Sequence, residues 1–336
     1  MGTTRFASEY AEKVLASELR ETVIRAVERS LGDSLLLSGG LDTSIVLSAL
    51  SSLEQWELLK SRFHAYTVVL EGSPSPDLAY SQMVTAKYGI RQTICRLNFS
   101  ELEDYLMDVV KVLKSFDPME IRNSVVLYAG LKLAKIDGFR AVMTGDASDE
   151  LFAGYSFVYN LQPDMGRATL IHLWDVMHFS SMPLASSLGI QAKLPFLDYE
   201  VKKFAMARLG WSDLVGKHNG ETYGKFILRR AFENSLPPEI VWRKKAPIEV
   251  GSGTAILPSI YSNILKDEEF EARRKEYLLK DRVKLRDKEQ LRYYEIYREL
   301  FGSPPPPDRS RKVCPACSMN VPDGAVFCTI CGEYPI

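Results

Sequence analysis

The sequence Ser-Gly-Gly-Leu-Asp-Thr-Ser at residues 38–44 limits the fold of this chain more than any other stretch. An apolar run at 34–37 precedes it, and a helical stretch at 45–50 follows it. A strand, a glycine turn and a helix in this order gather backbone N–H groups around an anion. Two adjacent glycines let the main chain approach a phosphate closely and adopt dihedral angles that other residues avoid. The stretch therefore predicts a phosphate-binding turn between a strand and a helix.

The side chains of this turn indicate which phosphate site it is. Ser38, Thr43 and Ser44 add hydroxyl donors, and the Asp42 carboxylate is a ligand that suits Mg²⁺. No Gly-Lys-Ser/Thr follows, which excludes the lysine-bearing P-loop. An ordinary βα turn with a helix N-cap is the alternative. The stretch resembles the pyrophosphate loop of the N-type ATP pyrophosphatases, with the signature Ser-Gly-Gly-x-Asp-Ser/Thr-Ser. Enzymes with that loop release pyrophosphate by attack at the α-phosphate.

Strand and helix signals alternate over the first 145 residues. We expect strands at 34–37, 63–70, 92–97 and 141–143, and helices at 7–30, 79–88, 101–113 and 124–136. This alternation predicts an α/β fold with a doubly wound parallel sheet and the ligand at the carboxyl ends of the strands. From about residue 155 the apolar pattern is helical and strand signals are absent. We expect an N-terminal helix at 1–30 that covers the sheet, a large domain at 31–302, a Pro-rich linker at 303–310 and a zinc ribbon at 311–336.

The ribbon is predicted from the cysteines. Four of the five cysteines form two Cys-x-x-Cys knuckles near the end of the sequence, at Cys314, Cys317, Cys328 and Cys331. Four thiolates so paired can surround one Zn²⁺, and a segment this short needs a metal to fold. A rubredoxin-like iron site or an iron–sulfur cluster is an alternative, and disulfides are a further one. The formal net charge is −1, so no overall field attracts nucleic acid or an anionic membrane.

A second motif follows the strand at 141–143. Residues 144–155 read Thr-Gly-Asp-Ala-Ser-Asp-Glu-Leu-Phe-Ala-Gly-Tyr, so acidic and hydroxyl side chains meet at a strand end beside the first motif. Asp149 can join Asp42 in holding Mg²⁺ on the phosphates, because Mg²⁺ prefers one or two carboxylates plus substrate oxygens. An acidic turn that caps a helix is the alternative.

With both motifs, the chain resembles the synthetase domain of the glutamine-dependent asparagine synthetases and the related β-lactam and carbapenam synthetases. That family's second motif reads Ser-Gly-Glu-Gly-Ser/Ala-Asp-Glu-Leu-Phe-Gly-Gly-Tyr. Further matches follow in the family's order over residues 30–255. They are Phe116-Asp117 with Ile121-Arg122, Leu194-Pro195-Phe196-Leu197-Asp198, Ile227-Leu228-Arg229, and Trp242-Arg243-Lys244-Lys245 with Gly251 and Gly253.

The resemblance implies a role for each matching residue. Asp42 and Asp149 would hold Mg²⁺, Val68 would lie near the adenine and Gly145 would contact the nucleotide. Lys245 would reach the α-phosphate and stabilise the charge that develops in the transition state, whereas Lys244 is expected on the solvated surface. Pyrophosphate would be held by Ser38, Gly39, Gly40, Asp42, Thr43 and Ser44.

Several positions depart from the family pattern. Asp146 stands where the synthetases carry a glutamate base, and its carboxylate is one methylene shorter. Gln191 and Lys193 replace a Glu-x-Arg, and Met119-Glu120 replaces a threonine pair. Only 37 residues precede the first motif and residue 2 is Gly, so we expect no N-terminal glutaminase domain with a cysteine nucleophile.

The leading hypothesis is a cytoplasmic, ATP-dependent carbon–nitrogen ligase that uses ATP, Mg²⁺ and Zn²⁺. It adenylates a substrate carboxylate, aspartate or a related acid, releases pyrophosphate and then amidates with ammonia or an amine, leaving AMP. A separate glutaminase or amine donor is an expected partner, and the ribbon is expected to bind a protein rather than RNA. The alternative function is a pyrophosphate-loop enzyme that adenylates an RNA base in tRNA modification. A nucleotide-sensing scaffold without activity is a third hypothesis.

Overall fold

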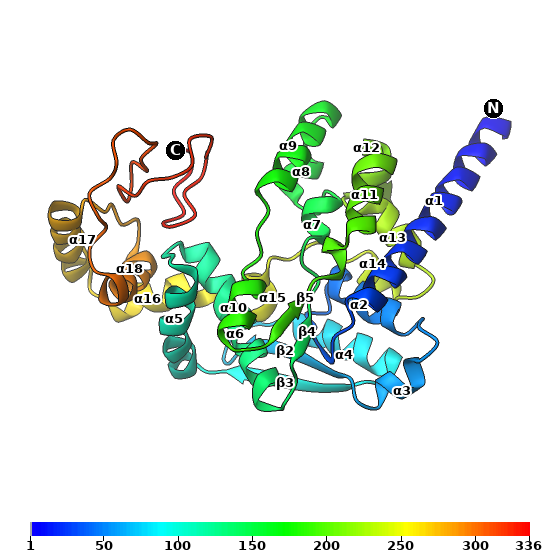
Figure 1. Ribbon diagram of the computed structural model, residues 1–336, viewed down its shortest axis with the longest axis horizontal. Helices are drawn as coiled ribbons and strands as arrows, with labels where there is room; N and C mark the ends of the chain where they lie inside the picture. Colours follow the sequence, from blue (N-terminus) through cyan, green and yellow to red (C-terminus); the bar gives the residue numbers. More distant parts are fainter. Residues whose placement is uncertain (1) are drawn as a thin grey trace. The chain divides into compact units, whose positions relative to one another are not determined.

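The structure is a computed structural model that describes the backbone of residues 2–336 and the side chains from residue 9 onward. Within those residues, the main sheet has the strand order β3-β2-β1-β4-β5. Its β1–β2, β1–β4 and β4–β5 pairs are parallel. This order confirms the predicted α/β parallel sheet (Figure 1). The strands are β1 (Ser34–Leu36), β2 (His64–Leu70), β3 (Arg91–Leu97), β4 (Ala141–Met143) and β5 (Gln191–Lys193).

The strand order creates a topological switch point between β1 and β4. The chain leaves β1 toward β2 and β3 on one side, and continues after β4 to β5 on the other. In open α/β sheets the crevice at such a point, beyond the carboxyl ends of the strands, is where ligands bind. Both sequence motifs directly follow these two central strands. The fold therefore places them at the same edge of the sheet.

The prediction of no strands after residue 155 was wrong. Strand β5 pairs with β4 in the register Ala141↔Gln191, Val142↔Ala192 and Met143↔Lys193. It is three residues long and lacks β-branched residues, so its sequence carries no strand signal. Pairing with β4 supplies the backbone hydrogen bonds that local propensity does not predict. A small antiparallel pair, β6 (Gly216–His218) and β7 (Glu221–Tyr223), was also missed, because each strand is only three residues long.

The chain divides into two compact units, and each is made of separate stretches. Unit 1 contains residues 1–67, 76–95 and 130–247, and unit 2 contains 68–75, 96–129 and 248–336. The boundaries expected from the sequence, at 30, 302 and 310, stay a prediction.

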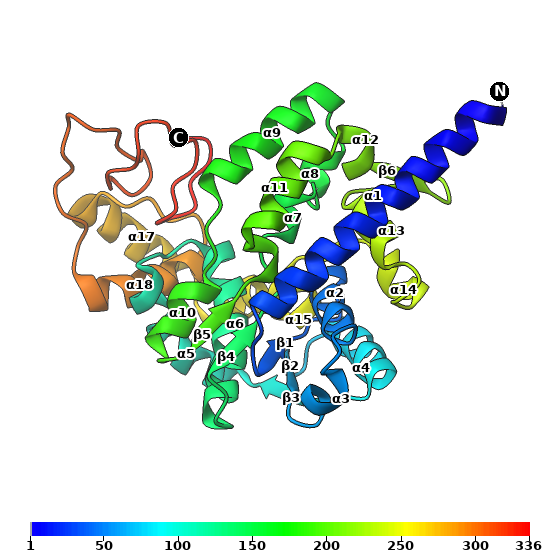
Figure 2. The same cartoon turned by 45° about the vertical axis from the view of Figure 1, so that its right-hand side comes forward.

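Unit 1 packs its helices around the central strands. The buried core joins Leu35 of β1 to Ile45 and Leu47 of α2 (Leu41–Leu50). Helix α1 (Gly2–Arg29) adds Leu19 and Val27 to this core. Its main contacts are with α2, α11 and α13 (Figure 2). The other unit 1 helices are α3 (Trp56–Lys60), α4 (Asp77–Tyr88), α7 (Ser148–Leu151), α8 (Ser156–Tyr159), α9 (Pro163–Val176), α10 (Ser181–Ser187), α11 (Tyr199–Arg208), α12 (Trp211–Leu214), α13 (Phe226–Phe232) and α14 (Pro238–Val241).

Unit 2 is mostly helical. Helix α5 (Phe99–Leu113) begins with a capping box, in which Asn98 and Glu101 each accept a hydrogen bond from the other's backbone N–H. Helix α6 (Pro118–Ile136) begins six residues before the predicted start and passes from unit 2 into unit 1. None of the helices within residues 2–336 is long and apolar enough to cross a membrane. The remaining unit 2 helices are α15 (Ile248–Ser252), α16 (Leu257–Ile264), α17 (Asp267–Asp281) and α18 (Lys288–Phe301).

Candidate functional site

The loop between β1 and α2 has the shape of an anion site. Gly39 has a φ of 69°, and a Cβ on it would lie 2.2 Å from the backbone nitrogen of Ser81, so only glycine fits. Gly40 donates its N–H to Ser38 Oγ at 3.1 Å, and that oxygen lies 3.3 Å from Thr43 Oγ1. Gly40 is the N-cap of α2 and offers no side-chain acceptor, so the N–H groups of the first turn are available to an anion.

Each motif also contains a buried hydroxyl group without a hydrogen-bond partner among the described residues. These are Ser44 Oγ, in the first turn of α2, and Ser148 Oγ, at the start of α7. A buried hydroxyl that makes no hydrogen bond costs about 1–3 kcal/mol. Unpaired donors at both motifs fit a site that holds a polar ligand such as a nucleotide.

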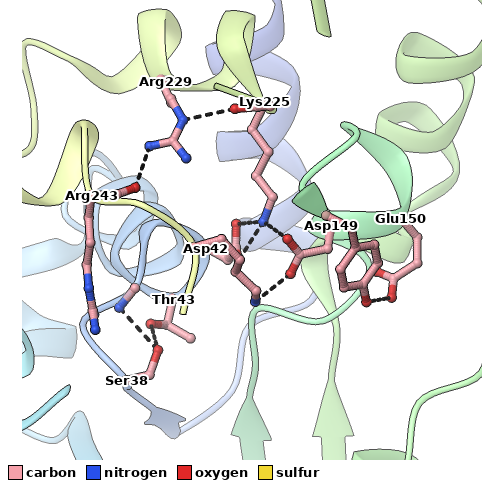
Figure 3. A network of polar contacts seen from close by, with 12 residues as sticks. Ser38, Asp42, Thr43, Asp149, Glu150, Lys225, Arg229 and Arg243 are labelled. Atoms are coloured by element: carbon pink, nitrogen blue, oxygen red, sulfur yellow. Dashed lines mark hydrogen bonds and ion pairs between the residues drawn. The ribbon is translucent and has the colours of Figure 1, made fainter. Parts of the chain in front are cut away.

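Asp42 and Asp149, 107 residues apart in the sequence, are joined by one ammonium group (Figure 3). Lys225 Nζ lies 2.6 and 2.7 Å from the two carboxylate oxygens of Asp42 and 2.7 Å from Asp149 Oδ1. The Lys225 side chain is buried, so this pairing supplies the charge compensation that burial requires. Two carboxylates that approach one small cation this closely form a donor set that suits Mg²⁺.

Lys245 contacts Asp149, the second carboxylate of this pair. Its Nζ donates to Asp149 Oδ2 at 2.7 Å, so Asp149 lies between two ammonium groups. Burial raises the pKa of the Asp149 carboxyl, but Lys225 and Lys245 outweigh burial and hold this pKa well below its usual range. Burial lowers the pKa of Lys245, and Asp149 and Asp42 outweigh burial and raise it. Both groups are therefore charged at neutral pH.

Arg229 connects the segments that carry the two lysines. Its guanidinium donates to the carbonyl of Gly224, next to Lys225, at 3.0 Å. It also donates to the carbonyls of Val241 and Arg243, just before Lys245. These bonds fix the lysine segments relative to each other. They give the Ile-Leu-Arg match at 227–229 a positioning function.

Asp146 is held by two hydroxyl groups. Thr144 Oγ1 donates to Asp146 Oδ2 at 2.9 Å, and Ser181 Oγ donates to the same oxygen at 2.5 Å. Burial raises the pKa of Asp146, although these two hydrogen bonds lower it. A raised pKa makes a carboxylate a stronger base. With Oδ2 occupied by both hydroxyls, Oδ1 is the oxygen available to a proton.

Two glycines let the motifs approach each other. A Cβ on Gly145 would lie 2.8 Å from Asp42 Cβ and 3.0 Å from the backbone nitrogen of Thr43. A Cβ on Gly154 would lie 2.0 Å from Asp149 Oδ1 and 2.2 Å from Lys225 Cε. The second motif therefore packs directly against the first, and the ion pair depends on the space at Gly154.

The structure brings most of the predicted site residues together in unit 1. Ser38, Thr43, Gly145 and the two aspartates lie around the loop and its ion pairs. Lys244 is exposed and pairs with Glu221 at 2.8 Å, which confirms its predicted surface position. Val68, the residue expected near the adenine, is buried on β2 and belongs to unit 2.

Sequence reasoning missed Lys225 and Ser181. Lys225 lies two residues before the Ile-Leu-Arg match at 227–229, but nothing in its neighbourhood marks it as the partner of two carboxylates 76 and 183 residues away. Its φ of 56° is rare outside glycine and is not readable from the sequence. Ser181 is one of many serines. Only the fold shows that it reaches Asp146.

In unit 2 the four knuckle cysteines form one buried cluster. The four Sγ atoms all lie within 4.8 Å of one another, and the Cys314–Cys331 and Cys317–Cys328 pairs are 3.7 and 3.8 Å apart. A tetrahedral zinc site with Zn–S bonds of about 2.3 Å has sulfur atoms about 3.8 Å apart. The cluster is therefore compatible with a closed four-thiolate zinc site.

Comparison with known proteins gives one consistent result. The family model described as asparagine synthase matches residues 15–171 and 183–316. Asparagine synthetase B (glutamine-hydrolyzing) of Escherichia coli (strain K12) is 28% identical over 310 residues, covering 86% of this chain and 54% of the relative. A probable asparagine synthetase (glutamine-hydrolyzing) of Dictyostelium discoideum is 29% identical over 329 residues, covering 87% and 56%. This chain thus spans about half the length of the curated relatives it matches.

Proposed function

Because the chain belongs to the asparagine synthase family, we propose that it is an ATP-dependent ligase that forms amides, with AMP and pyrophosphate as its other products. The observation that carries the proposal is the meeting of Asp42 and Asp149 at Lys225 Nζ, at the switch point of the sheet. A pair of carboxylates beside a glycine turn and a helix N-terminus is what a Mg-pyrophosphate site requires.

The first step is attack by a substrate carboxylate oxygen on the α-phosphorus of ATP. The bond from that phosphorus to the bridging oxygen breaks, which gives an acyl-adenylate and pyrophosphate. The N–H groups and hydroxyls at 38–44 bind the leaving pyrophosphate. Asp42 and Asp149 would hold Mg²⁺, which would supply positive charge to the phosphate oxygens. Lys245 Nζ donates to Asp149 in this structure. It would stabilise the negative charge that develops at the α-phosphate in the transition state.

The second step is attack by an amine on the acyl carbon. The bond between that carbon and the phosphate-bearing oxygen breaks, and AMP leaves. The attacking nitrogen loses a proton, and Asp146 Oδ1 is the acceptor that the local hydrogen bonds favour. Burial raises the pKa of Asp146 and so improves it as a base. We propose aspartate or a related acid as the carboxylate substrate that becomes the amide. The nitrogen would come from ammonia, an amine or a separate glutaminase.

The test is the identity of the products. The protein is incubated with ATP, Mg²⁺, aspartate and ammonium, and phosphorus NMR follows the nucleotide. AMP and pyrophosphate are expected in equal amounts, with mass spectrometry detecting the amide. ADP and phosphate would contradict the proposal. A parallel reaction with bulk tRNA in place of aspartate addresses the alternative, because pyrophosphate release only with tRNA would favour adenylation of an RNA base.

We also propose that the four cysteines hold one Zn²⁺ as a structural ion. All four thiolates serve as ligands, so the site leaves no open position for catalysis. Metal analysis of the purified protein is expected to give one zinc per chain.

A further inference from the structure

The second cysteine knuckle provides hydrogen-bond acceptors to the segment between α5 and α6. Phe116 donates its backbone N–H to the carbonyl of Ile330 at 2.7 Å. Ser115 Oγ donates to the carbonyl of Thr329 at 2.9 Å. Thr329 and Ile330 are the two residues between Cys328 and Cys331. The loop that binds the metal therefore also binds the segment leading into α6.

The same knuckle is also held by α18 and the segment before it. Gln290 Nε2 donates to the carbonyl of Cys331 at 2.7 Å, and Arg286 donates to the carbonyl of Gly332 at 3.0 Å. The first knuckle is attached in a similar way, since Lys284 donates its N–H to the carbonyl of Ala316 at 2.7 Å. Main-chain carbonyls make these contacts, so they depend on the course of the backbone around the cysteines.

The knuckle also sets the space around Asp117, which caps α6. Asp117 Oδ1 accepts from the N–H of Met119 at 3.2 Å. Gly332 has a φ of 75°, and a Cβ on it would lie 2.2 Å from that oxygen. The Phe116 ring is buried and makes edge contacts with Tyr294 and Tyr297 of α18. The start of α6 is thus enclosed between α18 and the knuckle.

From these contacts we propose that the metal-loaded ribbon is a clamp that holds residues 115–117, and with them the start of α6, in place. The four thiolates and their ion fix the 328–331 loop, and the loop fixes the segment. A short segment with few apolar side chains cannot keep this backbone course without its metal. The clamp is a property of unit 2, so it holds or fails independently of the proposed ligase activity.

Hydrogen exchange of the full-length protein, read by mass spectrometry, tests the clamp. The zinc-loaded protein is compared with protein stripped by a chelator and with the variant Cys331→Ser. Peptides covering 113–119 are expected to exchange at least about tenfold faster without metal, while peptides from α2 in unit 1 are unchanged. The variant Cys95→Ser, which removes a thiol outside the ribbon, is the matched control and should behave as the wild type.

The variant Gly332→Ala distinguishes loss of the clamp from loss of the metal. It leaves all four thiolates in place but puts a methyl group against Asp117 at a backbone angle that alanine disfavours. One zinc per chain is expected to remain, with faster exchange at 113–119. Unchanged exchange at 113–119 in metal-free protein whose ribbon peptides exchange freely would overturn the proposal. Equal acceleration of the α2 peptides would also overturn it, because the metal would then act on the whole fold.

Discussion

At the scale of single residues, the site depends on the absence of a Cβ atom at Gly154. Gly154 leaves room for the ion pair between Asp149 and Lys225, whereas an alanine Cβ would lie 2.0 Å from the carboxylate. We predict that Gly154→Ala displaces the pair and lowers the rate of pyrophosphate release about 100-fold, the cost of a misplacement of about 1 Å. Gly324→Ala, at a position with open space, is the control. A Gly154→Ala protein with the wild-type rate would show that the pair is not needed.

Two adjacent lysines differ in their surroundings and so give a matched comparison. Lys245 contacts Asp149 in the site, whereas Lys244 pairs with Glu221 on the surface. Lys245→Ala is expected to cut the rate about 100- to 1,000-fold with little change in ATP affinity, because its charge is needed mainly in the transition state. Lys244→Ala should leave both unchanged. Single-turnover kinetics and equilibrium ATP binding measure the two quantities, and loss of affinity at constant rate would assign Lys245 to ground-state binding.

At the scale of helices and strands, elements with a clear local signal were predictable, whether long or short, and elements without one were not. The helix at 79–88 and the strand at 141–143 follow from periodicity and turn residues, and they match α4 and β4 within two residues. Strand β5 exists because β4 pairs with it. In the site, Asp42 and Asp149 belong to motifs, so their meeting could be expected. The part that Lys225 plays could not be expected, because it is set by the packing of α13 and not by the neighbours of Lys225 in sequence.

Helix α18 carries a buried acid that should make stability depend on pH. Burial raises the pKa of Glu289 to about 7, although Arg122, 3.2 Å away, opposes the shift. Between about pH 4.5 and 7 the folded protein therefore binds more protons at this residue than the unfolded chain, and stability falls as pH rises through this window. The full loss is about 3.5 kcal/mol, from a pKa difference of about 2.5 at about 1.4 kcal/mol per unit.

Urea unfolding of the zinc-loaded protein at pH 5 and pH 8 measures this effect. Glu289→Gln should reduce the difference between the two pH values by most of that amount, because the amide does not titrate. Glu268→Gln, which changes an exposed residue of α17, is the control. If Glu289→Gln kept the wild-type difference, other groups would be responsible for it.

At the scale of the whole molecule, neither unit is a continuous piece of chain. Unit 1 is interrupted twice, and unit 2 is assembled from three stretches that begin at residues 68, 96 and 248. The lysine that joins Asp42 to Asp149 comes from the last stretch of unit 1. The candidate site is therefore complete only when segments distant in sequence have packed. Local sequence signals cannot specify this packing, although they specify the elements that take part in it.

The contacts of the second knuckle have a consequence for synthesis of the protein. The acceptors for Ser115 and Phe116 are residues 329 and 330, so more than 200 residues must be added before these bonds can form. At about 5–20 residues per second this takes on the order of 10–40 s. During that time the apolar faces of α5 and α6 have emerged from the ribosome without their partners. Unit 2 cannot complete these contacts until residues 329 and 330 have been made, and this interval is when its helices are most exposed to aggregation and to chaperones.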